Sequence, residues 1–402
     1  MKPTTRLLSI FAIIYLIFAC GDEDEPRLQR FDVTFQLLFP EDFLQESASD
    51  VAVKLVNLAS GQQVELVSGV DGEVVFVDLV PGAYSLQASR FLDEAEAIAM
   101  VGTPLNINLN YVNANMLLNT TSAGSPIQIR LAGSVTGNLV ISQVYYAGSK
   151  TPEGSNYFFD QFFEIYNNSS EPIALDGLIL SNIHGPSGQI NPNTIPTPFA
   201  DDQSNVYITT AWRIPGNGNT QVLQPFSAVT IAQQGINHRA PEANPGSPVD
   251  LSQANFELFV VGSERDVDAP NVPNMEMLYH PFNGTFSLVP VFGPATIIWR
   301  TDDFDALERV AIPGANPTAP PVVRVPNGLV IDAVEALRSE TDGGFKRIPV
   351  SLDAGFSFVN GTYSSESIRR KSRTVDGNML YVDTNNSTND FAINPSPSPT
   401  NR

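Results

Sequence analysis

The sequence predicts an all-β protein built from two β-sandwich domains. Hydrophobic and polar residues alternate over several short stretches, which is the two-residue period of half-buried strands. Proline (31) and glycine (28) are frequent and charged residues make up only 16% of the chain, a composition that suits short strands joined by many turns. With 402 residues, of which 42% are hydrophobic, the chain is long enough for two or three cores. Helix is expected only in short pieces, such as residues 330–340.

The first 19 residues have the pattern of a signal peptide. Lys2 and Arg6 precede an apolar run over residues 7–18, which is shorter than the roughly 20 residues needed to span a bilayer. The run ends at Ala19 and Cys20, the only cysteine of the sequence. This end resembles the lipobox of bacterial lipoproteins, in which the cysteine thiol is acylated and the cysteine becomes the first mature residue. The alternative is cleavage near Ala19 that leaves a free thiol.

An acidic tether is predicted over residues 20–30. The stretch from Gly21 to Pro26 contains four successive carboxylates, which stay solvated and do not pack into a core. It resembles the export signal of Bacteroidetes surface lipoproteins, and this resemblance implies an anchored protein on the outer face of the outer membrane. The alternative is a solvated tether that carries no such signal.

Residues 31–133 are predicted to form the first sandwich. Phe31, Val33, Phe35 and Leu37 alternate with polar residues, as in a half-buried strand. Further strands and turns resemble the prealbumin-like modules of the carboxypeptidase-regulatory and Cna-B types, which usually serve as spacers. Tyr84 is expected to bury its ring while its hydroxyl bonds to backbone. The strands of this match are expected near residues 51–55, 64–66, 74–77 and 84–88, with turns at Asp71-Gly72 and Pro81-Gly82.

Residues 138–402 are predicted to form a second, larger sandwich. Gly177 is followed by leucine where lamin-tail domains commonly carry tryptophan, and the surplus length between His184 and Ser367 is expected to form long loops. The segments that resemble a lamin-tail domain, an immunoglobulin-type sandwich, are residues 139–148, 162–168, 173–180, 224–231, 367–370 and 383–386. Residues 145–150 and 385–391, together with the acidic tether, also resemble a family of Bacteroidetes surface lipoproteins of unknown function.

Few residues have the spacing of a catalytic or metal site. His184, His238 and His280 are the only histidines of the sequence, and no two stand at an i, i+4 ligand spacing, so we expect no metal. No Gly-x-Ser-x-Gly elbow occurs, and the glycines after Trp212 lack the Lys-Ser/Thr of a phosphate loop. We therefore expect no catalytic residue and no cofactor. Glu164 is expected to be a partly buried structural carboxylate, and a role as general base is the alternative.

Clustered carboxylates supply the alternative interpretation as an enzyme. Asp302, Asp303, Asp305 and Glu308 lie close together in the sequence, and a metal-dependent hydrolase could use such a group. None of the acidic clusters has the spaced ligands and central glycine of an EF-hand loop. A solvated acidic surface is the other interpretation.

Aromatic and arginine side chains give the stronger indication of a binding surface. These side chains dominate the energetic centres of protein interfaces, and aromatic faces also stack on sugars. The alternative for each aromatic residue is the filling of a core. The predicted binding residues are Tyr145, Tyr146, Tyr157, Phe158, Trp212, Arg213, Trp299 and Arg300.

Charge and resemblance together predict the function. Asp and Glu outnumber Lys and Arg by 43 to 22, which gives a formal net charge of −21 and disfavours nucleic acid as a partner. The lipoprotein resemblance implies a lipid-anchored protein of the outer membrane, and the lack of a recognisable catalytic motif in the sequence predicts that this protein is non-catalytic. Such a protein would bind a small molecule or glycan, or dock on a β-barrel receptor of TonB-dependent transport as an accessory subunit. The alternatives are a metal-dependent hydrolase and a structural or adhesive surface protein.

Overall fold

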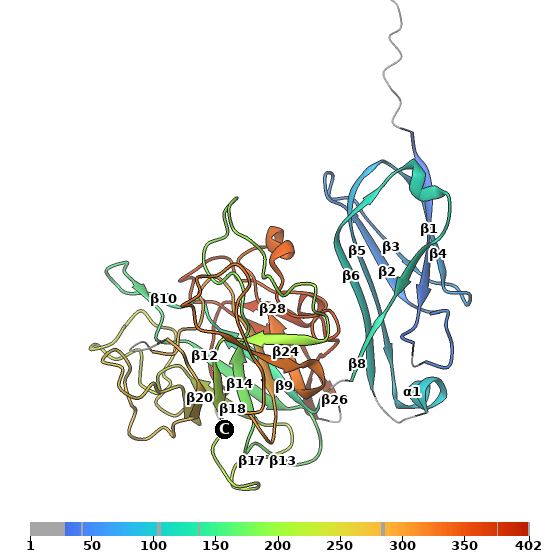
Figure 1. Ribbon diagram of the computed structural model, residues 1–402. Coiled ribbons are helices and arrows are strands. Elements are labelled where there is room, and N and C mark those ends of the chain that lie inside the picture. Colours follow the sequence, from blue (N-terminus) through green and yellow to red (C-terminus); the bar gives the residue numbers. More distant parts are fainter. Residues whose placement is uncertain are drawn as a thin grey trace, which may run out of the picture.

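The regular secondary structure of the described residues is almost entirely β-strand, which confirms the predicted all-β class (Figure 1). The computed structural model describes residues 29–400 except residues 42, 103–105, 136, 283–285 and 376. The signal peptide, Cys20 and residues 21–28 of the tether lie outside these described residues. None of the helices within the described ranges has the length and apolar character needed to cross a bilayer.

The first sandwich consists of a three-stranded and a five-stranded sheet that share one core. In sheet order the smaller sheet contains β4 (Glu73–Leu79), β1 (Phe31–Leu38) and β7 (Ile127–Arg130). The larger sheet contains β3 (Gln63–Val67), β2 (Ala52–Asn57), β5 (Gly82–Leu92), β6 (Ile107–Leu118) and β8 (Ala132–Val135). The helix α1 (Glu94–Val101) and the 3-10 turn η1 (Thr120–Ala123) lie in two of the connections.

The alternation of hydrophobic and polar residues explains which side chains of β1 face the core of the first sandwich. Val33, Phe35 and Leu37 of β1 are fully buried while the residues between them face outward, as the alternation predicts. Tyr84 buries its ring, and its hydroxyl donates to the carbonyl oxygen of Val80 at 2.7 Å. Both sequence expectations are confirmed.

The second part of the chain contains a six-stranded and a five-stranded sheet whose side chains meet in the largest core. The six-stranded sheet has the order β19 (Phe256–Glu257), β18 (Ala228–Ala232), β12 (Phe162–Asn167), β9 (Leu139–Tyr145), β25 (Ser367–Arg370) and β28 (Phe391–Asn394). The five-stranded sheet has the order β20 (Glu276–Tyr279), β16 (Ala211–Arg213), β14 (Ile179–Asn182), β21 (Ala295–Trp299) and β24 (Val330–Glu335).

Smaller elements complete this part. A three-stranded sheet packs on the five-stranded sheet around a further core, and it contains β15 (Asn205–Ile208), β23 (Val322–Pro326) and β22 (Arg309–Val310). The two-stranded pairs are β10 (Ser149–Lys150) with β11 (Asn156–Tyr157), β13 (Ile173–Ala174) with β17 (Val222–Leu223), and β26 (Ser372–Val375) with β27 (Asn378–Tyr381). Short helical turns are η2 (Asn327–Leu329), η3 (Glu340–Phe345) and α2 (Ser387–Asp390).

Two expectations for residues 184–367 need correction. The helix predicted over residues 330–340 is wrong, because residues 330–335 form β24, which pairs with β21 at the edge of the five-stranded sheet. Pairing with a buried strand overrides the helix preference of the local sequence. Nor do residues 184–367 form loops alone, since they supply β16, β20, β21 and β24 of that sheet.

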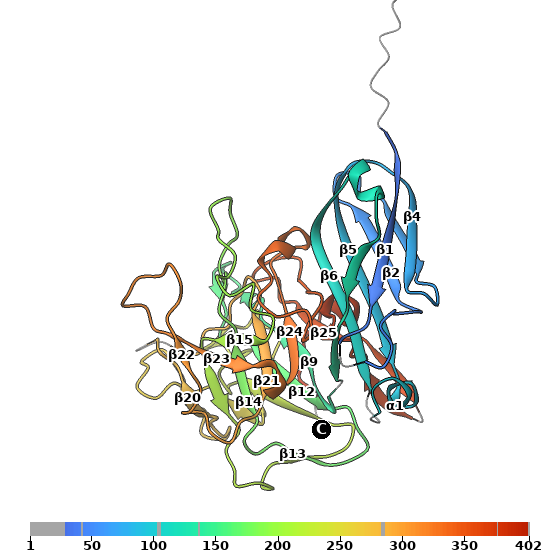
Figure 2. The ribbon, with the colours of Figure 1, turned by 45° about the vertical axis from the view of Figure 1, so that its right-hand side comes forward.

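The two parts of the chain meet through polar contacts. The side chains of Asn108 and Asn110 on β6 donate to the backbone carbonyls of Asp383 and Thr384. Asn385 also donates its side-chain amide to the Ser134 hydroxyl. Both views show the first sandwich lying beside the second body (Figures 1 and 2), and in Figure 1 β10 lies on the far side of that body.

Candidate functional site

Four of the predicted binding residues, two tyrosines and two tryptophans, fill the cores. Tyr145, Tyr146, Trp212 and Trp299 are all at most 1% exposed, so they cannot line an open binding surface, and their selection as binding residues needs correction. The Tyr145 hydroxyl donates to Asp160 at 3.1 Å, and burial, assisted by the Asp160 charge, raises the pKa of this tyrosine. Large aromatic rings contribute most when they are removed from water, and that is how these four are used.

The two predicted arginines hold structural contacts. Arg213 forms a bidentate pair with Glu276 at 2.7 and 2.9 Å, joining neighbouring strands β16 and β20. Arg300 donates to the backbone carbonyls of Ala174 and Asp176. Each guanidinium is therefore engaged within the second part of the chain, and the tryptophan that precedes it in the sequence is buried.

Tyr157 and Phe158 belong to an accessible aromatic cluster, which we call the distal cluster: Tyr157, Phe158, Phe159 and Phe286. The rings of Phe158 and Phe159 stack with centroids 4.9 Å apart, and Phe159 meets the buried Phe286 edge-on at 4.9 Å. The Arg265 guanidinium lies 4.8 Å from the Phe286 ring centroid. Tyr157, Phe158 and Phe159 keep part of their surface in water.

Exposed apolar side chains continue the distal cluster along the chain segment that carries Phe286. Val261 is 79% exposed, Leu288 is 55% exposed, and Val267 and Phe282 are each 45% exposed. This segment and the β10–β11 hairpin lie at the end of the second body that faces away from the first sandwich (Figure 1). Several exposed apolar side chains on one chain segment, next to an aromatic cluster in the sequence, are typical of a surface that meets a partner.

A row of polar side chains crosses the outer face of the six-stranded sheet. Thr230 pairs with Glu164, Glu164 with Gln143, and Gln143 with Arg369, on four successive strands. Residues paired in this way point to the same face of a sheet. Glu164 is fully buried; it accepts hydrogen bonds from the Ser142 hydroxyl at 2.8 Å and from the Thr400 amide at 2.7 Å. Glu164 is therefore hydrogen-bonded as expected, and it is more deeply buried than expected.

The C-terminal segment lies over this polar row. The Gln143 side chain donates to the Ser398 carbonyl at 3.4 Å, and Arg369 donates to the Thr400 hydroxyl at 3.4 Å. Arg369 also stands 3.9 Å from the Glu164 carboxylate. The segment therefore covers Glu164 and divides the face into two hollows.

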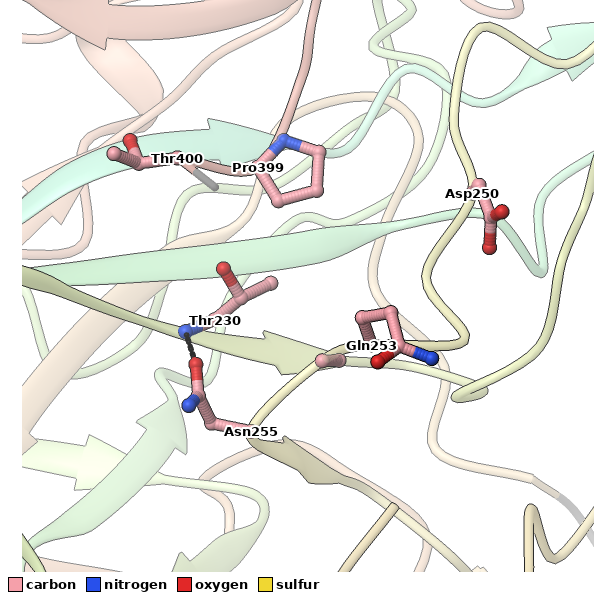
Figure 3. A pocket seen from close by; sticks show the side chains of 7 residues that line it. Thr230, Asp250, Gln253, Asn255, Pro399 and Thr400 are labelled. Atoms are coloured by element: carbon pink, nitrogen blue, oxygen red, sulfur yellow. Dashed lines mark hydrogen bonds between the residues drawn. The ribbon is translucent and has the colours of Figure 1, made fainter. Parts of the chain in front are cut away.

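The first hollow has a volume of about 380 Å³ and a mostly polar lining that includes the carboxylate of Asp250. Pro399 and Thr400 stand on one side, and the loop that carries Asp250 and Gln253 stands on the other (Figure 3). Asn255 accepts from the Thr230 amide at 2.8 Å, which fixes the floor. Hydroxyl and amide groups of this kind can satisfy the polar groups of a small ligand.

The second hollow, of about 320 Å³, lies on the other side of Arg369 and is basic. Its walls come from β25, the β26–β27 hairpin and β28. The Arg369 guanidinium donates to the Tyr381 hydroxyl at 3.1 Å. Burial alone would lower the pKa of Arg369, but the bond to Tyr381 and the Glu164 charge raise it. Arg369 is not among the binding residues predicted from the sequence, although four basic residues stand together at residues 369–373 of an otherwise acidic chain.

A buried ion cluster supports the sheet behind this hollow. The Arg370 side chain contacts Asp332 at 2.7 Å, Asp390 at 3.1 Å and Asp383 at 3.2 Å, and all four side chains are at most 3% exposed. Burial raises the pKa of Asp332 to about 7 and that of Asp390 to about 6, although Arg370 opposes both shifts. The cluster ties β24, β25 and the closing loop before β28 together.

The residues considered for metal chemistry are dispersed. Across the described ranges, no three His, Cys, Asp or Glu side chains are placed to hold a metal ion. Asp302, Asp303 and Asp305 are exposed on a turn, and Glu308 pairs with Arg324 at 2.6 Å. His238 is buried, and its Nδ1 lies 2.8 Å from the Tyr157 hydroxyl.

The comparisons with known proteins identify a family region and a similar structure. A search of curated proteins found no match. The chain is similar, over 90% of its length and 94% of that chain, to the crystal structure of a DUF4876 family protein from Bacteroides thetaiotaomicron, at 29% sequence identity and a TM-score of 0.57. BcpA, the major pilin subunit of Bacillus cereus, shows 10% identity over 76% of this chain and 95% of its own, with a TM-score of 0.17 that supports no inference. Residues 224–398 match the family described as "Protein of unknown function (DUF4876)".

Proposed function

We propose that this chain is a non-catalytic surface lipoprotein that docks through its distal end on an outer-membrane receptor of TonB-dependent transport. The observation that carries the proposal is the distal cluster with the exposed side chains of Val261 and Leu288. Aromatic side chains with an arginine beside them, such as Arg265 on Phe286, are typical of the energetic centre of an interface. A surface of this kind on a protein of net charge −21 is costly to leave in water without a partner.

The proposed placement supports the choice of this end. Acylation of Cys20 would attach the chain to the outer membrane ahead of the first sandwich, and the acidic tether would carry it to the outer face. The first sandwich, proposed as a prealbumin-like spacer over residues 31–133, would then separate the membrane from a lamin-tail-like domain over residues 138–402. The similarity to a Bacteroides protein agrees with the proposed location at the outer membrane.

Recovery of a receptor from membranes tests the proposal. Native protein with its lipid anchor is used to capture partners from detergent-solubilised outer membranes, and bound proteins are identified by mass spectrometry. The test variant is Val261→Ser with Leu288→Ser. The matched control is Val75→Ser with Val77→Ser on β4 of the first sandwich, where the side chains are 46% and 65% exposed.

The expected result is a β-barrel transporter that binds the wild type and the control and is lost with the distal variant. Failure to recover a β-barrel with the wild type, or its retention by the distal variant, would contradict docking through this end. Mass spectrometry of the mature amino terminus tests the anchor separately, because an unacylated start would remove the proposed placement.

A structural or adhesive surface protein is the second candidate. It is favoured by the burial of Trp212 and Trp299, which removes the two largest side chains from any binding surface. Cells that lose adhesion or envelope integrity on deletion of the gene, without any change in nutrient uptake, would support this alternative.

A further inference from the structure

One segment of the second part carries exposed apolar side chains at the distal end, and we call it the distal loop: residues 258–272. It connects β19 to β20. Val261 and Val267 of this loop are exposed to solvent, and its Arg265 guanidinium lies against the Phe286 ring of the distal cluster. The conformation of the loop therefore sets where these side chains stand relative to the distal cluster.

The side chain of Glu257, which directly precedes the loop, ties it to a second chain segment. One carboxylate oxygen accepts a hydrogen bond from the Ala269 amide of the loop at 2.8 Å, and the other accepts from the Gly235 amide at 2.7 Å. Gly235 follows β18, and a Cβ placed on it would fall 2.7 Å from Val272 of the loop. The two segments are in close contact, and Glu257 bonds to both of them.

Glu257 is a buried carboxylate in acidic surroundings. Its side chain is fully buried, and the charged groups that act on it are the carboxylates of Asp266 and Asp268 in the distal loop. The Arg265 guanidinium is directed at an aromatic ring, and His238 on the second segment is bonded to uncharged groups. The neighbouring strand β18 contains no charged residue. An ionised Glu257 is therefore held by two backbone amides alone.

This environment links the loop to pH. Burial raises the pKa of Glu257 from 4.5 to about 7, and the two backbone hydrogen bonds offset only part of that effect. In an open loop, in which Glu257 loses both hydrogen bonds and meets water, the pKa would return to its ordinary value. The closed loop therefore binds the proton more tightly than the open loop. Its extra stability is fully present below pH 4.5 and is lost as the pH rises through 7.

We propose that Glu257 closes the distal loop when it is protonated and releases the loop when it is ionised. In the protonated form the carbonyl oxygen still accepts an amide, and the buried charge is gone. The consequence for binding rests on the proposed function, because the closed loop is the form that presents Val261 and Arg265 to the receptor. Docking is then stronger in mildly acidic surroundings than above neutral pH.

Hydrogen–deuterium exchange of the purified full-length protein tests the proposal without any receptor. Protection of the amides of the distal loop is measured at pH 6 and pH 8 and corrected for the pH dependence of the intrinsic exchange rate. Glu257→Gln removes the ionisable group. Glu264→Gln is the matched control, because Glu264 is an exposed acid of the same loop. Asp268→Asn, also at an exposed position, removes one of the charges that raise the pKa of Glu257.

Protection in the wild type and in Glu264→Gln should fall about tenfold between pH 6 and pH 8, as expected for a carboxyl whose pKa is 4.5 in the open loop and about 7 in the closed loop. The fall should be less than about twofold in Glu257→Gln and clearly reduced in Asp268→Asn. The second variant keeps the test valid if the first folds poorly. Equal protection of the wild type at both pH values, the full fall in Glu257→Gln, or an undiminished fall in Asp268→Asn would overturn the proposal.

Receptor capture at the same two pH values tests the link to docking. Wild-type protein should capture more of the β-barrel at pH 6 than at pH 8, and Glu257→Gln should capture equal amounts at both. Failure to capture any β-barrel would contradict the docking function, whereas the exchange measurement would still decide the role of Glu257.

Discussion

Replacement of Arg370 by methionine should destabilise the second part of the chain severely. The Arg370 guanidinium donates to both oxygens of Asp332 at 2.7 and 2.8 Å, and it also contacts Asp390 and Asp383. Removal of one partner from a buried ion pair typically costs about 3–5 kcal/mol, because the remaining charge stays buried without compensation. Here three carboxylates lose their shared cation, so we expect a loss of about 5 kcal/mol in the free energy of unfolding at pH 8.

The loss should become smaller in acid. The pKa of Asp332 is about 7 and that of Asp390 is about 6 with Arg370 present. Both pKa values should rise further without the arginine, since Arg370 lowers them. Protonation at pH 5 would then neutralise the abandoned carboxyls, and the destabilisation measured at pH 5 should be clearly less than that at pH 8.

Urea denaturation followed by tryptophan fluorescence measures this effect. Trp212 and Trp299 are the only tryptophans of the sequence, and both are buried in the second part of the chain. Their emission therefore reports unfolding of the region that contains the ion cluster. The matched control is Arg324→Met, whose pair with Glu308 is 44% and 55% exposed and should contribute less than about 1 kcal/mol. Equal losses in the two variants, or a loss below about 1 kcal/mol in Arg370→Met, would refute the reasoning.

Two further substitutions test the packing and the titration of single positions. Gly216→Ala should destabilise the protein by at least about 2 kcal/mol more than Gly218→Ala. Both glycines have positive φ, but only at Gly216 would the new Cβ fall 1.7 Å from the Asp176 carboxylate. Equal thermal midpoints of the two variants would contradict this prediction. Burial lowers the pKa of His238 from 6.5 to about 4. Between pH 6.5 and pH 4 this histidine is therefore protonated in the unfolded chain but not in the folded one. The free energy of unfolding should fall by up to about 3 kcal/mol as the pH drops through this range. Buried carboxyls with raised pKa values act in the opposite direction, so the measurement is the difference between wild type and His238→Gln in urea denaturation across this range. Parallel pH profiles would count against the assignment.

Those features of the first sandwich that depend on neighbouring residues could be predicted from the sequence. The alternation in β1, the turn at Asp71-Gly72 and the buried ring of Tyr84 depend on residues close to one another in the chain. The edge strand β24 could not be identified in this way. Residues 330–340 contain good helix formers, and only the pairing of residues 330–335 with β21 makes a strand there.

The candidate sites depended on contacts between distant residues. The polar row joins Gln143, Glu164, Thr230 and Arg369, which only the strand register brings together. Residue type alone suggested that Trp212 would bind a partner, since tryptophan serves both interfaces and cores, but burial depends on the whole fold. The basic run at residues 369–373 was visible in the sequence, although its position beside a hollow was not.

Site-specific crosslinking in intact cells tests the proposed docking most directly. A photoreactive amino acid is placed at Leu288 in the distal end or at Val77 on β4, where both side chains are more than half exposed, and crosslinked partners are identified after irradiation. The proposal predicts a β-barrel transporter crosslinked from position 288 and not from position 77. Crosslinks to a transporter from neither position, or equally from both, would contradict the assignment of the distal end as the docking surface.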